Sequence, residues 1–183
     1  MSIPATYALP LSLALALALP LGTTSALVAA DNSGNNSASI LVKDDITFIE
    51  EANQCGLLLI KESELVLKRK APGLNQEFAQ KMVTGHQAVN KELGELAARK
   101  GVMLSDTLNE DMQKKYDALA KTDDAKLGKK YLEHQVKEHK NAVDVFDNAT
   151  GDSKDPELKV FAVKHLPHLQ AHLDEVKRME DAQ

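Results

Sequence analysis

The amino-acid sequence predicts an all-α fold, a four-helix bundle, on three observations. Gly and Pro are sparse, with 9 and 6 among 183 residues, and aromatic residues make up only 4% of the chain. The apolar residues are mostly Leu, Ala and Val with many Lys and Glu between them, a composition that favours helix over sheet. Apolar positions also recur at helical spacing in four long stretches separated by Pro, Gly and polar turns.

An export signal is expected over residues 1–30. Leu and Ala alternate between Pro10 and Pro20, and small residues follow up to Ala30, which is the layout of a signal peptide cleaved after Ala30. The segment lacks the Lys or Arg of a typical signal. A membrane anchor is the alternative, but the run between the prolines is far shorter than the ~20 residues that a span needs. We therefore expect a periplasmic or otherwise exported protein.

The rest of the chain divides into a leader and one domain. Residues 31–43 are rich in Asn and Ser and are predicted to be a flexible leader. Residues 44–182 are predicted to form the bundle, with Asp44 or Asp45 capping its first helix and Asp155, followed by a proline, capping its last. The four helices are expected over 44–70, 75–100, 124–148 and from 156 onward.

Residues 101–124 form the longest connection, and we expect a short extra helix within it. Thr107 and Glu110 have the spacing of a capping box at the start of that helix. Helices of this size are roughly 37 Å long, a length that the connection can cross. A ferritin-like order with one long crossover is therefore possible, as is a simple up-and-down order, because the periodicity of the helices is the same in both.

Composition disfavours several classes of function. The formal net charge of −5 lies entirely after the signal segment, which argues against binding to nucleic acid. Cys55 is the only cysteine, so no intramolecular disulfide can form, and we expect a small buried apolar side chain there. The sequence has no Gly-rich phosphate loop, no Ser/His/Asp arrangement and no Glu-x-x-His pair of a di-iron site. An enzymatic activity is left unsupported.

Three of the six histidines are candidate metal ligands. His86, His139 and His172 fall on the apolar faces of three different helices and close to the midpoints of those helices. In a bundle they would lie at similar heights, where such folds build metal or cofactor sites. Imidazole suits the divalent transition metals zinc, copper and iron. The alternative is that each is a core histidine with a hydrogen-bonded partner.

Four further residues are possible accessory ligands. His168 lies four residues before His172, a chelating spacing on a helix, and Glu175 follows three residues after His172. Glu62, Glu138 and Glu175 could act as ligands or as hydrogen-bonding partners of the ligands, and each lies toward the edge of the apolar face of its helix. For these carboxylates, a solvated surface charge is the alternative reading.

Three stretches of the sequence carry a resemblance to a known family. They are Phe78-Ala-Gln-Lys-Met-Val-Thr-Gly-His86, then Tyr131 with Lys137-Glu-His139, and Asp155-Pro-Glu-Leu-Lys with Leu166-Pro-x-Leu-x-x-His172-Leu. From Phe48 to Met179 the chain thereby resembles the exported family called domain of unknown function 4142, often labelled a predicted outer-membrane protein. The resemblance implies export, a ferritin-like four-helix bundle, and these three histidines as characteristic residues. It implies no activity.

One position departs from that family pattern. Leu59 stands where the family usually has a glutamate, on the inward face of the first helix, and Glu62 points about 60° away from it.

The sequence as a whole leaves two main hypotheses for the function. The protein is a non-catalytic binding or structural protein of the cell envelope, with envelope components as partners, or it is a bundle that binds zinc, copper or iron. A ferritin-like oxidase is a third hypothesis.

Overall fold

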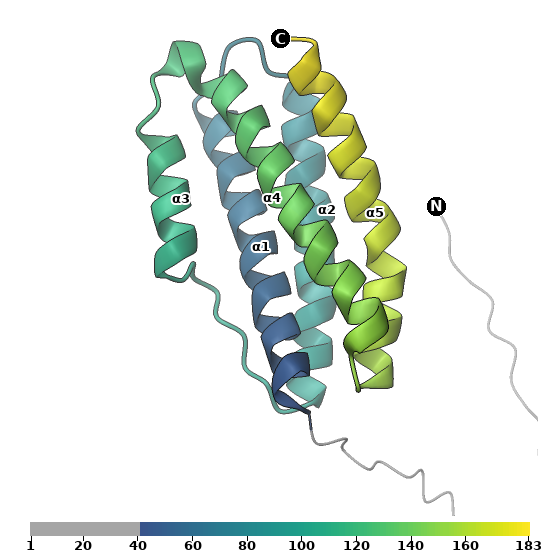
Figure 1. Cartoon of the computed structure of the whole chain (residues 1–183). Coiled ribbons are helices and arrows are strands. Elements are labelled where there is room, and N and C mark those ends of the chain that lie inside the picture. The colour runs from purple at the N-terminus through teal and green to yellow at the C-terminus, as the bar shows by residue number, and fades with distance from the viewer. Residues whose placement is uncertain (1–40) are drawn as a thin grey trace, which may run out of the picture. The chain divides into compact units, whose positions relative to one another are not determined.

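The computed structural model describes residues 41–183, so the predicted signal peptide and nearly all of the predicted leader lie outside the described part. Within it the chain forms five helices and no strand, which confirms the all-α prediction (Figure 1). The described helices include none that is long and apolar enough to cross a membrane. Their bounds are α1 Lys43–Lys68, α2 Gln76–Arg99, α3 Glu110–Ala120, α4 Asp124–Asp152 and α5 Pro156–Asp181.

The starts of α2 and α5 follow their capping signals. The side chain of Asn75 accepts a hydrogen bond from the backbone N–H of Glu77 at the start of α2. At the start of α5, Asp155 accepts hydrogen bonds from the backbone N–H groups of Glu157 and Leu158, as predicted. Pairing these exposed donors stabilises each helix end by about 1 kcal/mol.

Two predicted caps are wrong. α1 begins at Lys43 after Val42, which provides no side-chain cap. Asp45 is instead buried and bonded across the bundle. α3 begins after Asn109, whose side chain accepts a hydrogen bond from the backbone N–H of Met112, while the hydroxyl of Thr107 bonds to that of Ser105 in the preceding loop. Asn is the stronger cap of the two residue types, which explains the later start.

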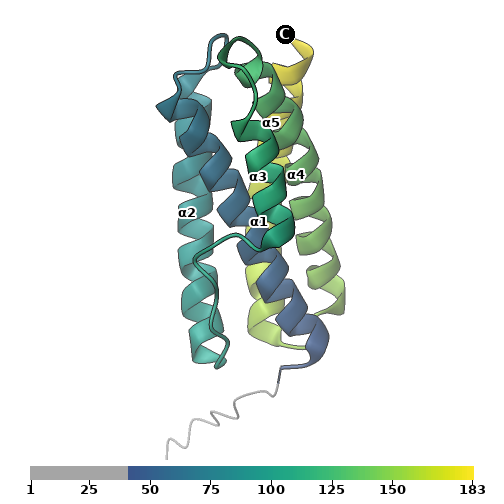
Figure 2. The same ribbon diagram turned by 90° about the vertical axis from the view of Figure 1, so that its left-hand side faces the viewer.

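The four long helices are joined by one long crossover. Arg69, just after α1, donates to the Asp124 carboxylate at the start of α4 across 2.6 Å. Lys100, just after α2, donates to Asp155 before α5 across 2.7 Å. α4 therefore runs antiparallel to α1, and α5 antiparallel to α2, so the segment containing α3 returns along the length of the bundle (Figures 1 and 2). This is the ferritin-like order.

The apolar core is divided into two clusters. One surrounds the rings of Phe48, Phe146 and Phe161, and the other surrounds Tyr131 and Phe78. Edge-on packing of such rings adds to the stabilisation from burial alone. On α2, α4 and α5 the buried residues of the two clusters lie on opposite sides of one position along each helix: between Met82 and Leu93, between Val136 and Ala142, and between Leu169 and Leu173. These three positions form a layer between the clusters, although the partly buried Val143 packs against both.

Candidate metal centre

The layer between the two core clusters holds three histidines. His86 on α2, His139 on α4 and His172 on α5 each offer one ring nitrogen, and these atoms all lie within 4.8 Å of one another. The ring centroids are 5.2, 5.5 and 5.7 Å apart. Among residues 41–183 this is the one group of three or more His, Cys, Asp or Glu side chains placed so closely. We call it the histidine trio.

The helices around the trio leave room for the three rings. His86 and His139 are buried, and His172 is half-buried beside α2. A Cβ atom added at Gly85 would lie 3.3 Å from Cε1 of His172, closer than most real Cβ contacts. The missing side chain at Gly85 is therefore what allows the imidazole of α5 to approach α2.

Hydrogen bonds determine the tautomers of two of the rings. Nδ1 of His139 lies 2.8 Å from the carbonyl oxygen of Gln135, so Nδ1 donates and Nε2 carries the lone pair. Nε2 of His86 lies 3.2 Å from that Nε2 and must donate to it. Nδ1 of His172 is buried without a hydrogen-bond partner among the described residues. The trio thus leaves one polar atom unsatisfied inside the protein.

Burial keeps the trio uncharged at neutral pH. Loss of solvation lowers the pKa of His139 to about 4 and that of His172 to about 4. Loss of solvation also lowers the pKa of His86 well below its ordinary value, and the neighbouring His139 and His172 lower it further. Neutral imidazole is the form that binds metals, so these rings need not lose a charge before binding.

Comparison with known proteins places the chain in a family. Residues 30–179 match the profile of the family described as Domain of unknown function (DUF4142). The chain belongs to this family. The resemblance seen in the three sequence stretches is confirmed. No curated protein matches the chain.

The fold has a counterpart among solved structures. It is similar to the crystal structure of a DUF305 fragment from Deinococcus radiodurans, with a TM-score of 0.67 over 78% of this chain and 99% of that chain. The two sequences are 10% identical, so the likeness concerns the fold alone. The histidine trio of this DUF4142 member must be interpreted from its own geometry.

Three of the accessory candidates lie outside the trio. Glu175 forms an ion pair with Lys81, and Glu138 accepts from Nζ of Lys115 across 2.8 Å. His168 is exposed on α5. None of them has a ligand atom in the group.

Glu62 is the accessory candidate whose surroundings differ most from the sequence expectation. Its side chain is fully buried, not solvated, and its carboxylate accepts from Nδ1 of His134 across 3.0 Å and from Nε2 of Gln135 across 3.1 Å. Burial raises the pKa of Glu62. The edge of the apolar face of α1 is covered because α1 packs against α2, α3 and α4, and not against a single neighbour.

Leu59, at the position that the family resemblance assigns to a glutamate, is fully buried beside the trio. Leu59, His86 and Cys55 line one small cavity of about 10 Å³, close to the size that admits a single water molecule. Cys55 is buried, as the sequence predicted, and burial raises the pKa of its thiol to about 11. α1 therefore brings no ligand to the trio from this position.

Proposed function

We propose that this protein binds one divalent transition metal ion through His86, His139 and His172. The supporting observation is that the ligand nitrogens of three neutral, largely buried imidazoles lie within 4.8 Å of one another. A buried imidazole needs a hydrogen-bond partner, but three bases that face one another cannot all satisfy each other. A single cation accepts all three lone pairs at once.

The spacing within the trio suits one ion. Zinc binds imidazole nitrogen at about 2.0–2.1 Å, which puts two nitrogens of a tetrahedral site about 3.3 Å apart. The Nε2 atoms of His86 and His139 are 3.2 Å apart. Binding requires the tautomer of His86 that carries its proton on Nδ1. Binding also requires the half-buried ring of His172 to move closer to the other two rings.

A purely nitrogen donor set favours zinc, copper or iron held singly over a carboxylate-bridged pair of iron ions. We therefore propose a binding role and no catalytic one. Electron transfer to oxygen at a di-iron pair would need carboxylate ligands, and the carboxylates of Glu62, Glu138 and Glu175 are bonded elsewhere.

Export to the cell envelope is the second part of the proposal. It rests on the signal-like sequence of residues 1–30 and on a family match that begins at residue 30, beside the predicted cleavage site. Expression with its own leader in a bacterial host should yield a periplasmic chain that starts at Asp31, as measured by intact mass. An uncut chain in the cytoplasm would contradict export.

Metal analysis of untagged protein tests the binding role. We expect about one equivalent of zinc, copper or iron per chain and a rise in melting temperature when the ion is added. The variant His139→Ala should lose both effects. His168→Ala removes an exposed histidine of α5 and should keep them. If the wild-type chain takes up no more metal than His139→Ala, the metal-binding role is wrong, and a structural role without metal is left.

A further inference from the structure

A fully buried carboxylate lies one helical turn from Leu59 and takes no direct part in the trio. Glu62 is 0% exposed, and burying a carboxylate costs several kcal/mol unless charges and hydrogen bonds compensate it. Both partners of its carboxylate, His134 and Gln135, come from α4. Such an arrangement needs a reason, because an apolar residue at this position would pack without that cost.

We propose that Glu62 is a positioning residue and the buried counter-charge of the metal site, acting through Gln135 and not as a ligand. This inference rests on the proposed metal binding by the histidine trio.

Gln135 links the carboxylate to the trio. Its side-chain Nε2 donates to Glu62 across 3.1 Å, and its backbone carbonyl accepts from Nδ1 of His139 across 2.8 Å. One residue thus fixes α4 against α1 and also holds the tautomer in which Nε2 of His139 is free to bind. Metal-binding histidines commonly depend on such an outer partner for their orientation.

The charge that a bound ion would bring to this layer supports the same role of Glu62. A divalent ion would add two positive charges to a layer of neutral rings, and opposite charge nearby lowers that cost. Glu138 is also buried in this part of α4, but the ammonium of Lys115 already pairs with it across 2.8 Å. Glu62 faces an imidazole and an amide, and no lysine or arginine of residues 41–183 is bonded to it. Burial raises the pKa of Glu62, and a cation bound at the trio would favour the ionised form of this carboxylate.

The role also gives α1 a part in the site. α2, α4 and α5 each supply one histidine, whereas α1 presents Leu59 to the cavity beside His86. Glu62 lies three residues along the same helix. α1 then contributes charge from a distance, while the other three long helices contribute ligands.

Titration calorimetry with zinc on the full mature chain tests the inference in matched variants. Glu62→Gln keeps the shape and removes the charge, and it should weaken zinc binding by about 10-fold, as other outer-shell changes do. Glu138→Gln removes the other buried carboxylate of the region, which already pairs with Lys115, and should weaken the affinity less than Glu62→Gln does. With cobalt in place of zinc, the visible absorption bands should shift in Glu62→Gln and stay unchanged in Glu138→Gln.

A rescue variant separates charge from structure. The double variant Leu59→Glu with Glu62→Gln returns a carboxylate to α1 beside His86 and should recover the affinity that Glu62→Gln lost. If wild type and Glu62→Gln bind equally tightly, or if Glu138→Gln is as weak as Glu62→Gln, the role of Glu62 is wrong while the metal site stands. If the wild type itself binds no zinc, copper or iron, both proposals fall together. Circular dichroism of each variant identifies any variant that has not folded. The cobalt spectrum of folded Glu62→Gln then shows whether loss of the charge changes the metal site.

Discussion

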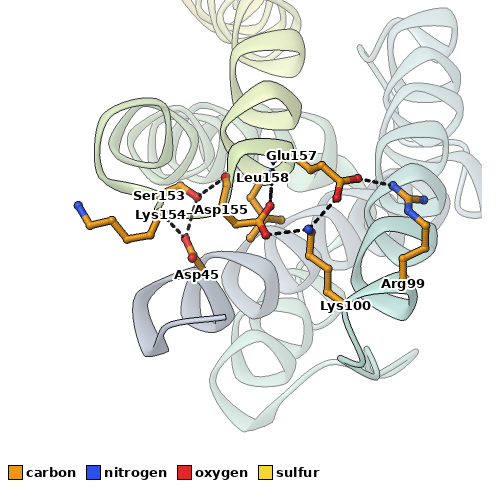
Figure 3. Close-up of polar contacts among 8 residues, drawn as sticks. All are labelled: Asp45, Arg99, Lys100, Ser153, Lys154, Asp155, Glu157 and Leu158. Atoms are coloured by element: carbon orange, nitrogen blue, oxygen red, sulfur yellow. Dashed lines mark hydrogen bonds and ion pairs between the residues drawn. The ribbon is translucent and has the colours of Figure 1, made fainter. Parts of the chain in front are cut away.

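Two buried polar regions of this bundle differ in how their polar groups are paired. At one end, Lys100 donates to Asp155 across 2.7 Å and to Glu157 across 2.9 Å, while the hydroxyl of Ser153 donates to Asp45 across 2.7 Å (Figure 3). Side chains of opposite charge and the cap of α5 lie together there, and their contacts link the ends of α1, α2, α4 and α5. We call this group the helix-end network.

The histidine trio, by contrast, brings together three groups of the same kind. It contains no acid, and Nδ1 of His172 has no partner among the described residues. The helix-end network completes its hydrogen bonds within the protein, so its role is to hold helices together. The trio is incomplete without a further group, which is the property expected of a binding site.

The largest effect on stability should come from the helix-end network. Asp155→Ala removes the cap of α5 and leaves the buried ammonium of Lys100 with Glu157 alone, so we expect the free energy of unfolding to fall by about 3 kcal/mol. Urea denaturation measures this. Lys91→Ala, which breaks the exposed pair with Glu95, should cost less than about 1 kcal/mol. Equal losses in the two variants would contradict the account of this network.

A change in the trio should act in the opposite direction on the metal-free protein. His172→Leu removes a buried nitrogen without a partner, so we expect the free energy of unfolding to stay level or rise by about 1 kcal/mol. The same variant should weaken zinc binding by more than about 100-fold, because a direct ligand is lost. A large loss of stability without metal would show that the trio is structural, like the helix-end network.

The thiol of Cys55 reports whether the middle of the bundle is closed. Its folded pKa is raised from 9.0 to about 11, so the thiolate fraction near pH 8 falls roughly 100-fold. Because the folded state favours the protonated thiol, this contribution to stability is complete below pH 9 and is lost as the pH rises toward about 11. Labelling with a thiol reagent should be at least that much slower in the native protein than in urea. Equal labelling rates in the native protein and in urea would mean that the middle of the bundle around Cys55 is open to solvent.

The smallest effect should separate two glycines of α2. Nothing lies within 4 Å of a Cβ atom added at Gly94, so Gly94→Ala should raise the free energy of unfolding by about 0.5–1 kcal/mol. At Gly85 the same change crowds the ring of His172, so thermal unfolding should show a smaller gain. Zinc binding should weaken in Gly85→Ala only. If both variants change zinc affinity and thermal stability equally, Gly85 does not make room for the trio.

The sequence located the histidine trio because a helix repeats one angle per residue along its whole length. His86, His139 and His172 each lie near the centre of an apolar face and near the midpoint of a helix, and both properties are read from the chain alone. The export signal, which falls outside residues 41–183, stays a prediction.

The features that the sequence missed depend on contacts between distant parts of the chain. Asp45 is bonded to Ser153, 108 positions away, and the local capping pattern contains no sign of so distant a partner. For Glu62 the sequence leaves an accessory ligand and a solvated charge open, because the apolar stripe of α1 marks one face only, whereas three other helices cover α1 in the bundle. The crossover order also rests on long-range pairs such as that of Arg69 with Asp124.

Anomalous diffraction from crystals soaked in zinc, recorded on both sides of the zinc absorption edge, tests the central claim most directly. We expect one strong peak between the rings of His86, His139 and His172, within about 2.0–2.1 Å of a nitrogen of each. A layer without a peak, with zinc bound only at surface carboxylates, would contradict it.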